Sequence, residues 1–75
     1  MTTLSNAGLI QAILNGCDLS RSLLDKANLS QASLVDAYLV RANLDGADFT
    51  DAVLTRAEMS GASSIGTIFS GATMP

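Results

Sequence analysis

The chain has 75 residues and a formal net charge of −3, with four basic residues and one cysteine. A chain of this length is marginal for an independent globular core, and a single cysteine offers no disulfide to support one. Nucleic-acid-binding surfaces need clustered Lys and Arg, so we expect no direct nucleic-acid binding. The opening residues MTTLSNAGLI lack both the basic start and the long apolar run of a signal peptide or membrane span. We therefore expect a cytoplasmic protein with no membrane segment.

A five-residue pattern begins at Thr2 and continues to Pro75, and it is clearest between Ala27 and Asp51. Each unit holds a small residue, a variable residue, a large apolar residue and two polar or turn-prone residues, which we number i−2 to i+2. Position i is large and apolar except at Ser64, whereas position i−2 is small throughout. The residues at position i are Leu4, Leu9, Leu14, Leu19, Leu24, Leu29, Leu34, Leu39, Leu44, Phe49, Leu54, Met59, Ser64, Phe69 and Met74.

A period of five excludes both regular secondary structures. A helix turns about 100° per residue, so successive central residues would be rotated by about 140° and could not share a face. A straight strand alternates with a period of two, so an odd spacing would send them to opposite faces. The chain must therefore turn once per repeat. Residues i−2 and i would then point inward from a three-residue strand, and i+1 and i+2 would form the corner.

Corners of the same hand predict a parallel solenoid in which each coil hydrogen-bonds to the next through its backbone. Periodicity alone does not decide between three-sided and four-sided coils. Ala27-Asn28-Leu29, Ala42-Asn43-Leu44 and Ala47-Asp48-Phe49 resemble the A(D/N)LXX motif of the pentapeptide-repeat proteins. This resemblance implies an all-β, right-handed parallel quadrilateral β-helix, with residues twenty apart stacked and just under four coils. We expect one domain, residues 1–75, with Phe49 stacked on Phe69.

Position i+2 is glycine at five corners and carries a side chain at nine others, so a positive φ should be permitted at the corners but not required. The segment from Ala62 to Gly66 breaks the pattern, because Ser64 replaces a leucine and Ile65 replaces a polar residue. This segment should be either bulged or loosely packed. The pattern has no polar capping helix at either end, which predicts either a piece of a longer protein or an associating chain.

No motif in the sequence indicates catalysis. The chain has no histidine, no Ser/His or Cys/His pair and no glycine-rich phosphate loop, so we expect neither enzymatic activity nor a cofactor. Cys17 occupies an i−2 position, where a small thiol should pack inside like alanine.

Stacking at twenty places Asp25 under Asp45, with Asp48 and Asp51 nearby, and so predicts an acidic face. A hard cation wants six or more oxygen ligands, and this ladder offers few, so a solvated acidic surface is the favoured interpretation and no metal site is expected. Some members of the family resemble a DNA duplex in shape and charge, and protect type II topoisomerases from quinolone drugs. Such a mimic needs a long rod with dense negative charge, whereas coils about 4.8 Å apart make this chain short.

A second candidate surface is apolar. The outward positions of two adjacent sides hold a candidate partner face: Ile13, Val35, Tyr38, Val40 and Val53. Single apolar residues are common on protein surfaces, but a group of them fits a protein partner. The leading functional hypothesis is therefore a rigid scaffold or protein-interaction module of unidentified partner, and the alternative is an acidic DNA mimic that binds a type II topoisomerase.

The coil ends form the third candidate surface. The last coil should expose Phe69 and Met74 on an open strand edge, and the first should expose Leu4 and Leu9. Open edges of a parallel coil can pair with one another, so we expect association of copies through their ends, either as a two-fold dimer or by head-to-tail stacking. The end with Phe69 and Met74 is the favoured contact.

Overall fold

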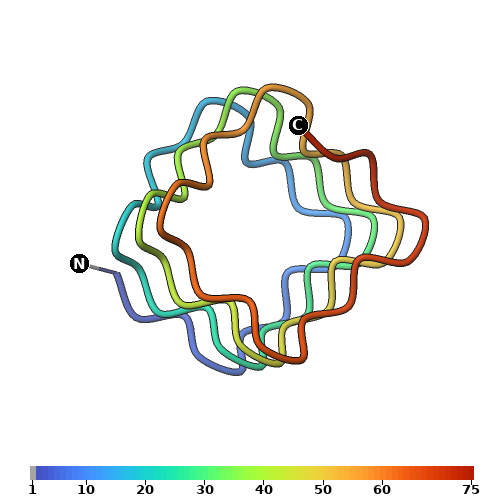
Figure 1. The fold of residues 1–75 in the computed structure, drawn as a ribbon. Helices are drawn as coiled ribbons and strands as arrows, with labels where there is room; N and C mark the ends of the chain where they lie inside the picture. Colours follow the sequence, from blue (N-terminus) through green and yellow to red (C-terminus); the bar gives the residue numbers. More distant parts are fainter. Residues whose placement is uncertain (1) are drawn as a thin grey trace.

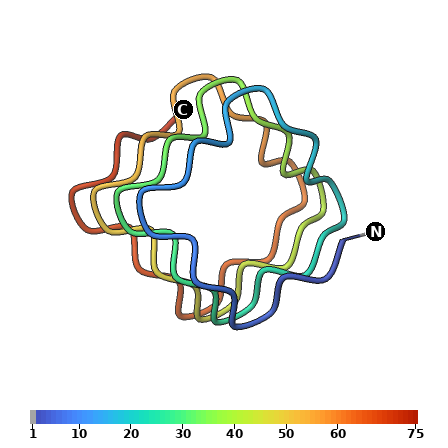
Figure 2. The same cartoon turned by 180° about the vertical axis from the view of Figure 1, so that it is seen from behind.

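A computed structural model describes residues 2–75, and it shows a coiled chain with a four-sided outline (Figure 1). The same outline is seen from behind (Figure 2). Parallel bridges join outward residues that lie twenty positions apart, so four repeats make one turn of the coil. We call each stack of such repeats a wall. The bridged pairs are Thr3–Leu23, Gly8–Asn28, Ile13–Ser33, Asp18–Tyr38, Leu23–Asn43, Asn28–Asp48, Ser33–Val53, Tyr38–Glu58, Asn43–Ser63, Asp48–Ile68 and Val53–Thr73.

The paired elements are shorter than the sequence predicts. Within residues 2–75 each strand is reduced to the single bridge residue at position i−1, and no helix is present. The expected three-residue strand is therefore too long, because a turn begins at every position i and leaves only i−1 in paired extended geometry. The alternation of side chains is nevertheless as predicted. In the middle of the chain, positions i−2 and i are buried and position i−1 is outside or half-buried.

Every corner is a hydrogen-bonded turn in which the carbonyl of residue i accepts from the N–H of residue i+3. Leu34 and Ala37 are an example, with an N–O distance of 3.1 Å. The third residue of each turn, position i+2, has φ between 58° and 71°, as in type II turns. Nine of these residues are not glycine. The expectation that a positive φ is only permitted is therefore wrong. All fourteen corners adopt it, because the chain turns the same way each time.

Adjacent coils are joined by a directional set of backbone hydrogen bonds. Residues 2–21, the first coil, donate eight N–H groups to carbonyls of residues 22–41 and accept four in return. The same numbers join residues 22–41 to residues 42–61. The donors toward the later coil stand at positions i and i+2, and the returning donors stand at i−1. In the part of the chain that the structure describes, the N–H at position i+1 makes none of these backbone bonds.

The core is a column of stacked leucines with alanines beside them. It is complete only in the middle of the chain, where Leu24, Leu34, Leu44 and Phe49 are fully buried. Leu4, Leu9, Leu14 and Phe69 are half-buried, because one of their two neighbouring coils is missing. Cys17 lies in the first coil and is half-buried for the same reason, rather than fully enclosed as predicted.

Stacking at twenty is visible in the aromatic pair. The rings of Phe49 and Phe69 lie 5.4 Å apart at an interplanar angle of 17°, which confirms the predicted stack. Near Ser64 the bridges continue without interruption, so the segment is not bulged. It is the looser alternative: Ser64 is exposed, and the turn that follows it closes with a longer N–O distance of 3.4 Å.

Candidate interaction surface

Residues 2–75 contain no group of three or more His, Cys, Asp or Glu side chains that could hold a metal ion. No buried side-chain nitrogen or oxygen of these residues lacks a hydrogen-bond partner. The candidate binding groups among these residues are therefore the side chains on the outside of the coil. Some of them form hydrogen bonds within the fold, and the others are available to bind a partner.

Asn and Asp side chains at position i−1 satisfy the N–H that the backbone leaves over. Their Oδ1 atoms accept from the N–H at i+1 of the same repeat, two residues later. The four pairs, with N–O distances of 2.9–3.1 Å, are Asp18–Ser20, Asn28–Ser30, Asn43–Asp45 and Asp48–Thr50. The second letter of the A(D/N)LXX motif is therefore a structural acceptor, because it replaces a missing backbone carbonyl. Sequence reasoning missed this role, although the motif itself carried the signal.

Asn15 and Asp45 do the same from the coil below. The Oδ1 of Asn15 accepts the N–H of Val35 at 3.0 Å, and the Oδ1 of Asp45 accepts the N–H of Ile65 at 2.9 Å. Position i+1 thus has two alternative sources for its acceptor, one within its own repeat and one twenty residues earlier.

The predicted acidic face is largely occupied by such bonds. Asp25 accepts from the hydroxyl of Ser5, and Asp45 accepts from the hydroxyl of Ser63 at 2.6 Å in addition to its backbone bond. Asp48 accepts from both the N–H and the hydroxyl of Thr50. These three residues are half-buried, and only Asp51 is exposed. Their carboxylates serve the turns of the coil.

Hydrogen bonding also sets the charge of these groups. The hydroxyl and then the N–H of Thr50 lower the pKa of Asp48 from its usual value, because both stabilise the carboxylate. The pKa of Asp18 is lowered by the N–H and hydroxyl of Ser20. Both residues are therefore anionic turn acceptors at neutral pH.

The candidate partner face extends over two walls and two corners. Ile13 and Val53 lie in one outward column, with Ser33 between them, and Val35 lies at the next corner. Ile13 is 79% exposed, whereas Val35, Val40 and Val53 are half-buried. Their role in binding a partner stays a prediction.

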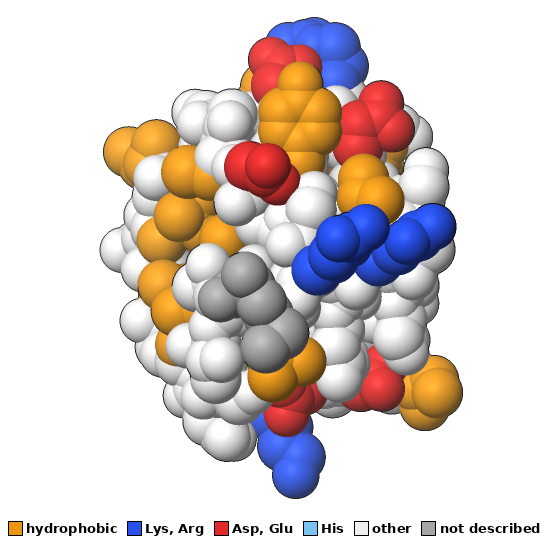
Figure 3. Space-filling view, turned by 90° about the vertical axis from the view of Figure 1, so that its left-hand side faces the viewer, with side chains coloured by type: hydrophobic (Ala, Val, Ile, Leu, Met, Phe, Trp, Pro, Cys, Tyr) orange, Lys and Arg blue, Asp and Glu red, His pale blue; other side chains and the backbone are white. Residues whose placement is uncertain are grey.

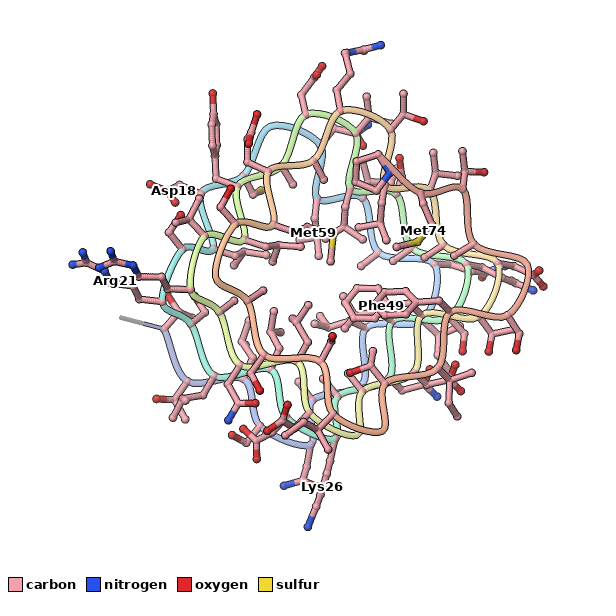
Figure 4. All side chains as sticks on the ribbon, viewed as in Figure 1. Asp18, Arg21, Lys26, Phe49, Met59 and Met74 are labelled. Carbon is pink, nitrogen blue, oxygen red and sulfur yellow. The ribbon has the colours of Figure 1, made fainter. Side chains whose placement is uncertain are left out.

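Tyr38 stands in the middle of the neighbouring wall, bridged to Asp18 below and Glu58 above, and its side chain is 49% exposed. We call the wall made by residues 17–21, 37–41 and 57–61 the Tyr38 wall. Arg21 and Arg41 lie at its far corner, twenty residues apart and exposed. Asp18 and Arg21 project outward on one side of the coil (Figure 4). That side faces the viewer in Figure 3, where basic, acidic and apolar groups lie close together.

The near corner of the Tyr38 wall carries an ion pair. Arg56 donates from Nε to Asp36 Oδ1 at 2.7 Å and from an η nitrogen to Oδ2 at 3.2 Å, as the stacking of residues twenty apart allows. The pair lowers the pKa of Asp36, chiefly through the hydrogen bond. Both side chains remain more than half exposed, so solvent screens their attraction.

A shallow depression of about 640 Å³ opens beside this ion pair. It is lined by Asp36, Tyr38, Arg56, Ala57, Glu58 and Pro75. The depression joins the Tyr38 wall to the end of the coil.

Sequence reasoning passed over several exposed apolar residues. Ile10, Ile65 and Ile68 are 57%, 77% and 46% exposed, respectively. Each stands at an outward position of its repeat, where a large apolar residue is the only available signal. They lie on corners and walls other than the Tyr38 wall.

The described residues contain no helix long and apolar enough to span a membrane. Three features together define a β-helical repeat protein. They are the parallel bridges at a spacing of twenty, the leucines that point inward and the corners that all turn the same way. The model of the pentapeptide repeats matches residues 3–39 and 32–71, with eight copies. The chain belongs to the pentapeptide-repeat family, as its motif predicts.

Solved structures of the same family resemble the chain. A pentapeptide repeat protein from the cyanobacterium Cyanothece 51142 is 30% identical with a TM-score of 0.65, and the match covers 97% of this chain and 54% of that one. HetL from Nostoc sp. strain PCC 7120, involved in heterocyst differentiation regulation, is 28% identical over 95% of this chain and 46% of its own, with a TM-score of 0.38.

A pentapeptide repeat protein of the Arabidopsis thaliana thylakoid lumen is 26% identical, with a TM-score of 0.42, over 95% of this chain and 60% of that one. The chain thus spans about half the length of the solved proteins that it matches. A search of curated proteins gave no significant match.

Proposed function

We propose that the chain is a non-catalytic interaction module: a rigid, right-handed β-helix of just under four coils that presents the Tyr38 wall to a protein partner. The observation that carries this proposal is the composition of that wall. Tyr and Arg are enriched where binding energy concentrates in protein interfaces, and this wall combines an exposed tyrosine with two exposed arginines at one corner.

Rigidity supports the same role. The coils are joined through their backbone by regularly repeated hydrogen bonds, so the outward side chains of the Tyr38 wall are held on a fixed frame. A surface that is ordered before binding loses less conformational entropy when it meets its partner. The Asp36–Arg56 pair at the near corner ties the long Arg56 side chain to Asp36 next to Tyr38.

Arg21 and Arg41 indicate the chemistry of the partner. They belong to the same corner of successive coils, and no carboxylate within the described residues lies within salt-bridge distance of either. Two neighbouring cations of this kind favour a partner that brings carboxylates to them, with an apolar or aromatic group against Tyr38. Their contribution is mainly to the rate and specificity of association.

The use of the acidic residues favours this surface over DNA mimicry. Asp25, Asp45 and Asp48 accept hydrogen bonds from the chain itself, which ties their carboxylates to the turns. A duplex mimic instead needs a dense display of free negative charge along a rod.

The test is affinity capture with the 75-residue chain as bait, followed by binding measurements on the captured protein. Tyr38→Asp should weaken binding at least tenfold, and Arg41→Glu should slow association, most strongly at low salt. Ile65→Asp is the matched control, because it places the same charge at an exposed apolar residue on another corner. Equal binding by Tyr38→Asp and the unmodified chain would contradict the proposed surface. Binding that depends instead on Asp51 would favour the acidic alternative.

A further inference from the structure

The two ends of the coil have opposite hydrogen-bonding polarity. Wherever two full coils meet in this chain, the earlier coil donates eight N–H groups and accepts four, as for residues 2–21 against 22–41. Any surface that faces the C-terminal direction is therefore rich in donors, and any surface that faces the N-terminal direction is rich in acceptors. This asymmetry results from the constant direction of the chain, and it extends to the two outermost coils.

The last coil, residues 56–75, carries the donor-rich surface. The N–H groups of this coil that point along the axis, away from the preceding coil, have no partner among residues 2–75. They belong to Arg56, Met59, Gly61, Ser64, Gly66, Phe69, Gly71 and Met74. Only four carbonyls accompany them, those of Ala57, Ala62, Thr67 and Ala72. The first coil shows the complement, with four N–H groups at positions i−1 and eight carbonyls at i−1 and i+1 that accept nothing from the described residues.

We propose that copies of this chain associate head to tail, with the last coil of one copy donating to the first coil of the next. This pairing sets seven of these donors, those from Met59 to Met74, against carbonyls of the next copy's first coil, and it gives the four returning bonds their acceptors, as between successive coils of one copy. The eighth donor, the N–H of Arg56, lies below Pro75 of its own copy. A two-fold contact through the last coils would set eight donors against four carbonyls on each side and leave N–H groups unpaired. The sequence leaves both arrangements open, and the polarity selects one.

The depression beside Pro75 fixes the rotation between copies. A coil rises along its axis, so its end surface has a step where the chain stops. The last bridge on the Tyr38 wall is Tyr38–Glu58, whereas the preceding wall continues to Val53–Thr73. The step therefore lies above Ala57 and Glu58, two of the residues that line the depression. The first repeat of the second copy, Thr2 to Leu4, fills this step when it lies above Ala57 to Met59.

Side chains match in this register. The second copy's Leu4 lies on Met59, its Leu14 lies on Phe69, and its Leu19 lies on Met74. Leu4, Leu14 and Phe69 are half-buried in the single chain, and Met74 is 48% exposed. Met59 and Met74 point toward the centre of the coil, where they meet the incoming leucines (Figure 4). Stacking thus gives the terminal residues the environment that Leu34 and Leu44 already have. The contact borders the Tyr38 wall, because Tyr38 lines the depression, but it leaves Arg21 and Arg41 uncovered.

The experiment is analytical ultracentrifugation of the 75-residue chain at several concentrations, with two variants that each block one end. Phe69→Lys places a charge on the last coil and Leu14→Lys places one on the first. Head-to-tail stacking predicts that the unmodified chain forms dimers and larger species as concentration rises. Each variant alone should remain a monomer. An equimolar mixture should form a dimer and nothing larger, because one intact last coil meets one intact first coil.

The other arrangements give different results. If Leu14→Lys alone forms a dimer, the contact is two-fold through the last coils, and if Phe69→Lys alone does so, it is two-fold through the first coils. Either result overturns the proposal, as does an unmodified chain that stays monomeric throughout. Circular dichroism checks the fold of each variant, and Met74→Lys, at a side chain that is already half exposed, replaces Phe69→Lys if that variant unfolds. Gln31→Lys, on the outside of a middle coil, is the matched control and should associate like the unmodified chain.

Discussion

The first coil and the middle of the chain have the same five-residue repeat, but equivalent side chains in the two regions are buried to different extents. Leu14 and Leu34 occupy the same position of the same wall, twenty residues apart, yet Leu34 is fully buried and Leu14 is half-buried. Ala37 and Cys17 differ in the same way. The repeat thus decides the direction of a side chain, whereas the coils above and below decide its burial. Matched substitutions in the two regions test this distinction.

The largest contrast is expected for truncation of the central leucine. Leu34→Ala should lower the free energy of unfolding by about 2–5 kcal/mol, because it leaves a cavity between two well-packed coils. Leu14→Ala should cost clearly less, because its neighbours border solvent and can collapse or hydrate. Urea denaturation of both variants measures the difference. Equal losses at the two positions would mean that the first coil is packed as tightly as the middle.

Overpacking at position i−2 should follow the same order. Ala37→Leu inserts bulk at a fully buried position and should cost about 1–3 kcal/mol in the free energy of unfolding. Cys17→Leu, at the equivalent position of the first coil, should cost less, and Thr55→Leu, at an outward corner, should be close to neutral. The same denaturation measurement applies. A neutral Ala37→Leu together with a damaging Thr55→Leu would reverse the assignment of inside and outside.

Loss of a turn acceptor should be the next largest effect. Asn43→Leu removes the acceptor of the Asp45 N–H in a partly buried setting and should cost about 1–3 kcal/mol. Asn43→Asp keeps an acceptor in place and should retain most of the stability. Asp18→Leu breaks the corresponding bond in the first coil, where the N–H of Ser20 is exposed and water can replace the carboxylate. Its cost should be smaller, and a larger cost for Asp18→Leu than for Asn43→Leu would contradict this account.

The smallest expected effect is on acid stability. Because the pKa of Asp48 is lowered in the folded chain by its bonds to Thr50, its contribution to the free energy of unfolding is present above the unfolded pKa. That contribution is lost as the pH falls below about 4 and through the folded value. Asp48→Asn keeps the amide oxygen as an acceptor and removes the titration. Its urea midpoint should therefore fall less between pH 7 and acid than that of the unmodified chain; an identical fall would show that Asp48 does not contribute.

The fold can be predicted from the sequence because the same pattern of large and small apolar residues recurs every five residues. The spacing of Leu24, Leu29 and Leu34 excludes a helix, and the small residues at i−2 mark the inside. The conformation at position i+2 could not be read in the same way, because Arg41 and Asp51 disfavour a positive φ that the geometry of the coil imposes on them. The motif repeats Asn or Asp at the position of Asn28, but its role as an acceptor depends on which N–H the coil leaves without a backbone partner.

The candidate surfaces were less predictable than the fold. Outward apolar residues such as Tyr38 and Ile13 could be identified from their position in the repeat, but their exposure depends on the neighbouring coil and on the ends. The sequence predicts a solvated acidic surface at Asp25 and Asp45 because it shows charge and spacing, not the hydroxyl of Ser5 or Ser63 that donates to each carboxylate. The repeated residues specify the geometry of the backbone, and they carry no information on the identity of a partner.

The spacing of twenty also links the length of the sequence to two properties of the molecule, its length along the axis and the rotation of its later residues about that axis. Duplication of residues 22–41 would add one coil, lengthen the axis by about 4.8 Å and leave every later side chain on its present wall. Duplication of residues 37–41 alone would instead turn everything beyond them by one wall, which would separate Arg56 from Asp36. Length and orientation can thus be adjusted separately, by whole coils or by single repeats, without any change in the residues that build the core.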